Sequence, residues 1–283
     1  MDWIERLNLS LEYIEQNLTE KPDYEKIARI ACCSAYHFQR MFAYLAGVPL
    51  GEYIRRRRMT LAAAELQTGD AKVIDLALKY GYDSPTAFNR AFQGVHGIAP
   101  SAARERGVSL QAFLPISFKI MVKGAAQMEY RIEQKESFRI VGLSAPLKEN
   151  LEENFQVVPQ LWAKAAQEGV MPKLAAMMDT PIKGVLGVSA CMGKDWYYYI
   201  AAASTLPLAD TGFVEYTVPA CTWAVFPGTG SMPGSIQTLE QRIVTEWLPT
   251  SGYEYADAPD VELYLTPDPQ NATFEVWVPV VKK

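Results

Sequence analysis

The sequence predicts an all-α domain built from two helix-turn-helix motifs, followed by an α+β domain built from two pseudo-symmetric strand and helix repeats. Three observations predict it. Up to about residue 106, apolar residues recur at helical spacing, with Gly and Pro between the periodic segments. From about residue 128, they form short runs rich in β-branched and aromatic residues. Each half also repeats itself. The predicted domains are residues 1–107 and 128–283, joined by a linker over 108–127.

The elements follow from these periods. The first half predicts seven helices, at residues 2–18, 23–31, 34–46, 50–68, 72–80, 84–95 and 100–106. The second half predicts two helices, at residues 152–168 and 235–248. It also predicts strands at residues 130–132, 138–144, 185–190, 196–202, 213–218, 222–226, 261–265 and 274–278.

Composition excludes several classes of protein. The 283 residues are 49% hydrophobic and 21% charged, as in globular proteins and unlike disordered, collagenous or coiled-coil chains. The longest uncharged stretch, residues 216–239, holds three prolines and three glycines, so no membrane helix fits there. The N-terminus lacks an apolar signal core. The four cysteines have no metal-type or disulfide-scaffold spacing. We therefore expect a cytoplasmic protein with no membrane association, metal or cofactor.

Charge divides the chain in the same place as the periodicity does. Residues 1–124 carry 16 Lys and Arg against 13 Asp and Glu, a net charge of +3. Residues 125–283 carry 11 against 19, a net charge of −8. A mildly basic first half and an acidic second half indicate two different tasks.

The first half contains a gapless repeat at an offset of 50 residues, between residues 33–42 and 83–92. Each copy keeps a serine, two phenylalanines and an arginine, namely Ser34, Phe38, Arg40 and Phe42 in the first and Ser84, Phe88, Arg90 and Phe92 in the second. The serines are suited to cap a helix, and phenylalanines four residues apart form a buried stripe. A short helix and a turn precede each copy, which is the order of a helix-turn-helix.

The face opposite each stripe carries side chains that can read base edges. They are Tyr36, Gln39 and Arg40 in the first copy and Thr86, Asn89 and Arg90 in the second. The alternative is a helical domain whose polar faces are only solvated. The run from Arg55 to Arg58 points around most of a helical turn, so at best about half of it reaches phosphate. We expect Arg55 to contact the DNA backbone, with a solvated face as the alternative.

Residues 5–106 resemble the paired helix-turn-helix DNA-binding domain of the AraC/XylS family of bacterial transcription regulators. The resemblance lies in SAYHFQRMFAYLAGVPLGEYIRRRRM and in IDLALKYGYDSPTAFNRAFQGVHGIAPSAAR. It implies two recognition helices, which begin at Ser34 and Ser84, are joined by one long helix over 50–68 and enter successive major grooves of double-stranded DNA. It places the six side chains above on base-reading positions and implies RNA polymerase as a partner. Two recognition helices on one chain favour a monomer on an asymmetric site.

The second half also echoes itself, because residues 213–230 and 130–146 both read as strand, turn and strand, with a helix and two strands after each. Residues 128–283 resemble the GyrI-like effector-binding domain. The resemblance lies in VPACTWAVF at 218–226, EWLPTSGYE at 246–254, DVELY at 260–264 and VWVPV at 276–280. The order of the two domains is similar to that of the Rob-type branch of the AraC/XylS family.

Strand parity predicts a ligand site in a cleft of the second half. Glu262 and Tyr264 alternate with apolar residues that would pack beneath the helices, and Trp277 alternates likewise on the last strand. An acid among aromatic rings suits a bulky lipophilic cation. Further aromatic candidates for the site are Trp223, Phe226, Trp162, Tyr197 and Tyr199. The resemblance places Glu262 on the family's pocket glutamate, with Tyr264 and Trp277 on lining positions. The alternative is that the aromatics are core and the glutamate is structural.

An enzyme is the less favoured hypothesis. The two histidines, His37 and His96, both lie in the first half, which excludes Ser–His or Cys–His chemistry in the second. GTGSMPGS at 228–235 lacks the lysine and the spacing of a phosphate loop. The resemblance leaves one enzymatic alternative, hydrolysis of a strained small ring with Glu262 as general base. A third possibility is a protein-interaction module that binds no ligand.

Overall fold

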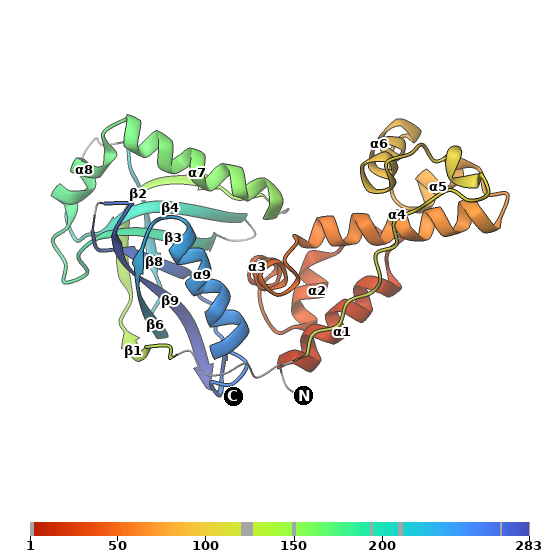
Figure 1. Ribbon diagram of the computed structural model, residues 1–283. Helices are drawn as coiled ribbons and strands as arrows, with labels where there is room; N and C mark the ends of the chain where they lie inside the picture. Colours follow the sequence, from red (N-terminus) through yellow and green to blue (C-terminus); the bar gives the residue numbers. More distant parts are fainter. Residues whose placement is uncertain are drawn as a thin grey trace. The chain divides into compact units, whose positions relative to one another are not determined.

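The computed structural model describes residues 3–119, 127–148, 151–192, 195–208, 212–266 and 268–282. The chain separates into two compact units, Met1–Ile120 and Met121–Lys283. The first unit is helical, and the second combines helices with an antiparallel sheet (Figure 1). The predicted order of fold classes, all-α and then α+β, is confirmed at this level.

Six helices form the first unit over its described residues, 3–119. They are α1 (Trp3–Gln16), α2 (Tyr24–Ile30), α3 (Ala35–Ala46), α4 (Leu50–Thr68), α5 (Val73–Lys79) and α6 (Pro85–His96). Their bounds fall within about two residues of the predicted ones. The helix predicted over residues 100–106 is only a 3₁₀ turn, η1 (Ala102–Arg104). The backbone is already extended at Glu105, and so short a segment gains too few hydrogen bonds to form a stable helix.

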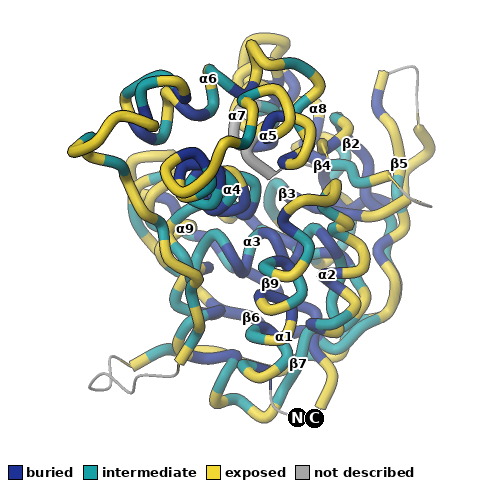
Figure 2. The backbone as a smooth tube through the Cα atoms, turned by 90° about the vertical axis from the view of Figure 1, so that its right-hand side faces the viewer, coloured by how far each residue is buried: buried dark blue, intermediate teal, exposed yellow. Residues whose placement is uncertain are grey.

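The core of the first unit lies beneath α4. Met59, Ala62 and Leu66 on its inner side pack with Phe88 and Phe92 of α6, and all five side chains are almost fully buried. Along the helices of this unit, buried residues recur between exposed ones (Figure 2). This is the amphipathic pattern on which the helix assignments rested.

Residues 108–119 belong to the first unit. They run extended past α4 to α1 (Figure 1, yellow). The N–H of Phe113 donates to Oγ1 of Thr60 at 3.0 Å, and the N–H of Phe118 donates to Oδ1 of Asn8 at 2.8 Å. This differs from the linker predicted over 108–127, of which residues 120–126 lie outside the described residues.

The second unit contains three helices and nine strands in its described part. The helices are α7 (Leu151–Gln167), α8 (Val170–Met177) and α9 (Gly234–Arg242), and α9 continues into a π-helical turn, η2 (Ile243–Trp247). The strands are β1 (Arg131–Lys135), β2 (Phe138–Pro146), β3 (Val185–Met192), β4 (Asp195–Ala203), β5 (Val214–Val218), β6 (Cys221–Gly230), β7 (Tyr253–Tyr255), β8 (Asp260–Tyr264) and β9 (Ala272–Lys282).

Two elements of this unit were not predicted, α8 and β7. Helix α8 contains Pro172, which reads as a helix breaker in a sequence. The proline lies in the first turn, where its missing N–H has no partner to lose. Strand β7 is three residues long and pairs with the end of β9, too short for a periodic pattern.

The strands form one antiparallel sheet in the order β1-β6-β9-β8-β3-β4-β2-β5, with β7 paired to β9. Helices α7 and α8 pack on β2 and β4, and α9 packs on β6 and β9 (Figure 1). Exchanging β1 with β5, β2 with β6, β3 with β8 and β4 with β9 reverses the strand order. A duplicated strand–strand–helix–strand–strand unit would give this arrangement, and the duplication itself stays a prediction.

The sheet curls around a core on the face that does not carry Glu262. Val188, Val261, Trp223 and Trp277 are buried together there. Phe138 of β2 reaches the Trp277 ring of β9, with 6.3 Å between ring centroids. Three strands lie between β2 and β9, a span of about 19 Å in a flat sheet. The contact therefore requires strong curvature.

Candidate DNA interface and ligand site

Both helix-turn-helix motifs hold their second helix by the same devices. The Ser34 and Ser84 side chains accept hydrogen bonds from the backbone N–H three residues further on, at 3.2 and 3.1 Å. The helices end at Gly47 and Gly97, which adopt left-handed backbone with φ of 70° and 75°. These caps satisfy backbone groups that a helix leaves unpaired at its ends, and they keep the offset of 50 residues.

The two turns before these helices also match. Each contains one residue with left-handed backbone, Cys32 with φ 56° and Gly81 with φ 75°. The residue after it donates its N–H to the carbonyl oxygen five residues earlier, at 3.1 and 2.9 Å. Three residues separate the end of α2 from Ser34, the cap of α3, and four separate the end of α5 from Ser84, the cap of α6, so the second turn is one residue longer.

The predicted base-reading face of α6 is open to solvent. Thr86 and Arg90 are exposed, and Asn89 is half-buried, while Phe88 and Phe92 beneath them are fully buried. The three polar side chains are thus placed where a helix in a major groove meets base edges. Their contacts with bases stay a prediction.

The corresponding face of α3 is more enclosed. The Arg40 guanidinium lies over the Tyr36 ring, 5.7 Å from its centroid, and both side chains are half-buried. Gln39 is only 4% exposed, which differs from the predicted exposed position. The predicted contact of Gln39 with a base stays a prediction.

The first two arginines of the run at 55–58 lie on the outside of α4. Arg55 and Arg56 both form ion pairs with Glu52, one turn earlier in the helix. The Arg55 side chain is 51% exposed, which leaves it available to a phosphate. Its predicted role in backbone contact stays a prediction.

The other two arginines hold the fold together. Arg57 is buried and donates to both carboxylate oxygens of Glu15, at 2.7 and 2.9 Å. Arg58 donates from Nε to the Leu18 carbonyl oxygen at 2.7 Å and from its terminal nitrogen to that of Glu20 at 2.5 Å. Neither phosphate contact nor a solvated face accounts for this pair. Four identical residues in a row carry no signal of which ones point inward.

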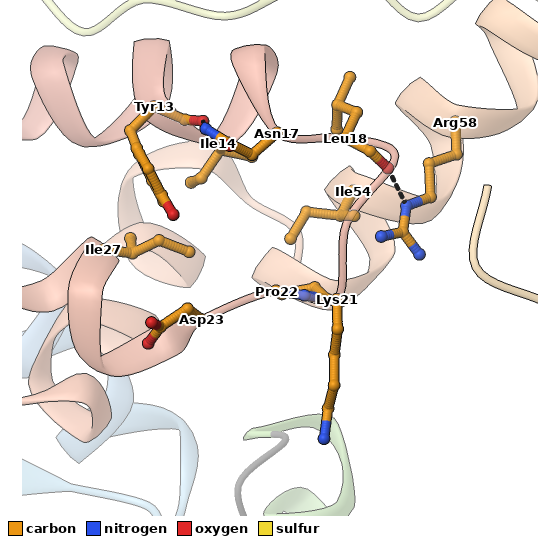
Figure 3. Close-up of a pocket in the computed structure, with 10 residues that line it drawn as sticks. All are labelled: Tyr13, Ile14, Asn17, Leu18, Lys21, Pro22, Asp23, Ile27, Ile54 and Arg58. Carbon is orange, nitrogen blue, oxygen red and sulfur yellow. Dashed lines mark hydrogen bonds between the residues drawn. The ribbon is translucent and has the colours of Figure 1, made fainter. Parts of the chain in front are cut away.

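A shallow pocket lies beside Arg58, where the end of α1 meets α2 and α4. Figure 3 shows the Arg58 guanidinium bonded to the Leu18 carbonyl, with Lys21 extending away from the pocket. The pocket is lined by Tyr13, Ile14, Asn17, Leu18, Lys21, Pro22, Asp23, Ile27, Ile54 and Arg58. It lies apart from the predicted base-reading residues, and the sequence did not predict it.

Glu262 of β8 gathers hydrogen-bond donors in the second unit. The Tyr264 and Tyr198 hydroxyls both donate to its Oε2 atom, at 2.8 and 2.9 Å. Trp162 of α7 donates from Nε1 to the Tyr198 hydroxyl at 3.2 Å, and its ring meets the edge of Tyr264 with 5.1 Å between centroids. We call these four residues the Glu262 cluster. It places a carboxylate among three aromatic side chains.

The cluster depends on a glycine in the neighbouring strand. Gly187 of β3 lies directly opposite Glu262. A Cβ there would clash with the Tyr198 hydroxyl and lie 2.7 Å from Oε2 of Glu262. Burial and then the Glu262 charge raise the pKa of Tyr264 well above its ordinary value, so its hydroxyl remains a donor. The sequence did not single out Gly187 or Tyr198, because their nearness to Glu262 depends on strand register.

The eight residues predicted for the ligand site divide between the two faces of the sheet. Glu262, Tyr264 and Trp162 are together, and Phe226 lies on the same face, two strands away. Trp277 is paired with Val261, so the prediction that it shares the face of Glu262 is wrong. The remaining three belong to the opposite core with it, namely Trp223, Tyr197 and Tyr199.

The helices cover the face that was predicted to be away from them. Trp162 of α7 contacts Tyr264, whereas Val261 and Leu263 belong to the core on the other face. The alternation of side chains between the two faces of β8 was predicted correctly. Alternation within one strand does not say which of the two faces the helices cover. The expectation that Val261 and Leu263 pack beneath the helices is therefore wrong.

Three further findings concern the described residues alone. They contain no group of three or more His, Cys, Asp or Glu side chains that could hold a metal ion. None of the four cysteines forms a disulfide there. Within the same ranges, no helix is both long and apolar enough to cross a membrane.

Two helix-turn-helix motifs in one compact unit define a DNA-binding protein. Comparison with family models agrees, because residues 27–106 match a helix-turn-helix domain. Residues 128–281, more than half of the chain, match the GyrI-like small molecule binding domain. The chain belongs to the AraC/XylS family of transcription regulators and carries a GyrI-like domain as its second unit.

Relatives that are named as regulators match about a third of the chain. The transcriptional activator AarP of Providencia stuartii is 48% identical over 94 residues, which are 33% of this chain and 70% of AarP. The regulatory protein SoxS of Salmonella typhimurium is 35% identical over 96 residues, 34% of this chain and 90% of SoxS. The second unit is similar in fold to SAV2435 bound to tetraphenylphosphonium, with a TM-score of 0.50 and 24% identity over 54% of this chain and 94% of that one.

Proposed function

We propose that this protein is a one-component transcription regulator whose DNA binding is controlled by a lipophilic cation at the Glu262 cluster. The observation that carries the proposal is that Tyr198 and Tyr264 both donate to the Glu262 carboxylate, while Trp162 donates to the Tyr198 hydroxyl. Ring faces attract positive charge, and a carboxylate neutralises it. The Trp162 ring packs against Tyr264, so a ligand would enter by displacing Trp162 and the part of α7 that carries it.

Tetraphenylphosphonium is the first cation to test, because the SAV2435 structure of similar fold contains it. Calorimetric titration would compare it with triphenylphosphine oxide, which is neutral and also carries phenyl rings. Glu262→Gln keeps the shape of the side chain and removes its charge. We expect Glu262→Gln to weaken binding of the cation about tenfold to a hundredfold, as for a lost charged contact. The affinity for the neutral compound should stay within about twofold of the wild-type value.

Two further variants sharpen this experiment. Trp162→Ala should weaken binding of both compounds, because it removes aromatic contact area that does not depend on the charge of the ligand. Glu215→Gln is the control, since Glu215 on β5 is 60% exposed and pairs with Arg139 away from the cluster. Unchanged binding of both compounds to Glu262→Gln would contradict the proposal. Hydrolysis of a compound that carries a strained small ring, lost in Glu262→Gln, would instead support the hydrolytic alternative, for which the geometry offers no specific observation.

We further propose that α3 and α6 read the bases of double-stranded DNA and that Arg55 contacts its backbone. The exposed Arg90 and the exposed Arg55 support this proposal. Arg90→Ala should weaken binding to a selected site by about 1–3 kcal/mol and relax preference at one base pair. Arg55→Ala should weaken selected and random duplexes alike and reduce the salt dependence. Equal losses on both duplexes for both variants would contradict these roles.

We infer RNA polymerase as a protein partner and the bacterial cytoplasm as the place of action. AarP, which shares 48% of its matched residues with this chain, is a transcriptional activator, and activators work by contact with the transcription machinery. Transcription from a promoter bearing the selected site, with purified polymerase, would test the partner. No change in transcript on adding the protein would contradict it.

A further inference from the structure

The strap, defined as residues 110–118, contacts structures beneath both recognition helices. At its start, the N–H of Gln111 donates to Nδ1 of His96, the last residue of α6, at 3.2 Å. Nε2 of His96 lies 3.0 Å from the Met59 carbonyl oxygen of α4. Leu110 packs against the core that holds Phe88 of α6. The strap is therefore fixed to the second motif at this end.

The middle of the strap is held by an ion pair between the buried Arg57 and the half-buried Glu15. Arg57 of α4 pairs with Glu15 of α1 and also donates to the Phe113 carbonyl oxygen. Tyr53 donates its hydroxyl proton to Glu15 at 2.7 Å and accepts the N–H of Ile116 at 3.3 Å. The Glu15 carboxylate of α1 thus holds Arg57 and Tyr53 of α4, and these two side chains hold the strap. Such a network is strong when every member has partners.

The end of the strap lies against the first motif. Asn8 of α1 and Phe118 exchange two hydrogen bonds, from Nδ2 to the carbonyl oxygen at 3.0 Å and from the backbone N–H to Oδ1 at 2.8 Å. The Phe118 ring meets Phe42 of α3 edge-on, with 6.1 Å between centroids. Phe42 is fully buried behind the base-reading face. The strap thus runs from the core of one recognition helix to that of the other.

We propose that the strap fixes the distance and angle between α3 and α6, so that both fit one DNA face at a single spacing. Successive major grooves on one face lie about 34 Å apart, so an error in spacing removes one helix from its groove. A rigid pair binds its second half-site at high effective concentration, and a loosened pair loses that advantage. Asn8, Thr60 and Phe118 are then positioning residues that touch no DNA. The inference rests on DNA binding by two recognition helices.

The test uses the full chain and a duplex that it selects from a random pool. Four duplexes are compared, namely the selected duplex, the same duplex with one base pair inserted between its halves, and two duplexes that each have one half randomised. Wild type should bind the selected duplex at least about tenfold more tightly than any of the others. Asn8→Ala should bind the selected duplex several-fold more weakly than wild type does. The inserted base pair should reduce its affinity less than it reduces that of wild type. It should bind the duplexes with one half randomised as tightly as wild type does.

Matched variants exclude a merely structural effect. Thr60→Val, which removes the acceptor of the Phe113 N–H, should act like Asn8→Ala, and Phe118→Ala should act more strongly. Leu114→Ala is the control on the strap itself, since Leu114 is 74% exposed. If Phe118→Ala unfolds, the two hydrogen-bond variants give the same comparison.

Two outcomes would overturn the inference. One is an equal loss of affinity for all the duplexes in Asn8→Ala. The other is that the inserted base pair reduces the affinity of Asn8→Ala as much as it reduces that of wild type. If wild type shows no preference for the two-part duplex, the proposed two-helix recognition fails instead.

Discussion

The two helix-turn-helix motifs share one framework and differ in the residues that build it. Both have a serine cap, a pair of buried phenylalanines and a left-handed glycine at the helix end. The second places glycine in its left-handed turn and proline after its cap, whereas the first has Cys32 and Ala35 there. Apart from Arg40 and Arg90, the shared residues are those whose loss would expose backbone or open a cavity. The positions that differ carry the smaller energies.

The largest effect should come from the phenylalanine stripe. Phe42→Ala and Phe92→Ala each remove a side chain with no exposed surface, so each should lower the free energy of unfolding by about 3–5 kcal/mol. Denaturant unfolding of the first unit measures both. Because Phe42 also contacts Phe118, its loss should also reduce protection of the strap from hydrogen exchange. A cost below about 1.5 kcal/mol for either variant would contradict the equal burial of the two stripes.

The helices were predicted from local signals, and the errors came from long-range ones. The serine caps and glycine ends lie within a few residues of the groups they satisfy, so the sequence indicates them directly. Trp277 was placed on the wrong face because parity is a property of one strand, whereas register joins two strands. Gly187 and Tyr198 were missed for the same reason, since both meet Glu262 only across the sheet. The strap has no periodicity, and a segment without periodicity reads as a linker.

The caps should have an intermediate effect. Ser34→Ala and Ser84→Ala each remove the acceptor for a backbone N–H in the first turn, at a cost of about 1 kcal/mol. Ser34 also lies 3.0 Å from Nδ1 of His37, so its loss should be the larger of the two. Thermal unfolding of both variants measures the difference. Ser101→Ala is the control, because Ser101 forms no cap bond at η1. Equal values for all three variants would show that the caps contribute nothing.

The smallest effect, and the one that most directly compares the motifs, should come from the turn residues. Cys32 has φ 56°, a conformation that costs an L-residue about 1 kcal/mol and costs glycine little. Its side chain is exposed, so replacing it removes little packing. Cys32→Gly should therefore raise the free energy of unfolding by about 0.5 kcal/mol, after the entropy that glycine adds to the unfolded chain is subtracted.

Gly81→Ala is the reverse experiment. A Cβ there would lie 3.5 Å from the Arg58 guanidinium, an ordinary contact, so space does not forbid alanine. The backbone angle of 75° does disfavour it, and the variant should lose about 1 kcal/mol. Opposite signs for the two variants, measured by denaturant unfolding of the full chain, would show that both turns need the same left-handed residue. If Cys32→Gly instead destabilises the protein, the cysteine contributes contacts that outweigh its strained backbone, and the two turns are equivalent in shape only.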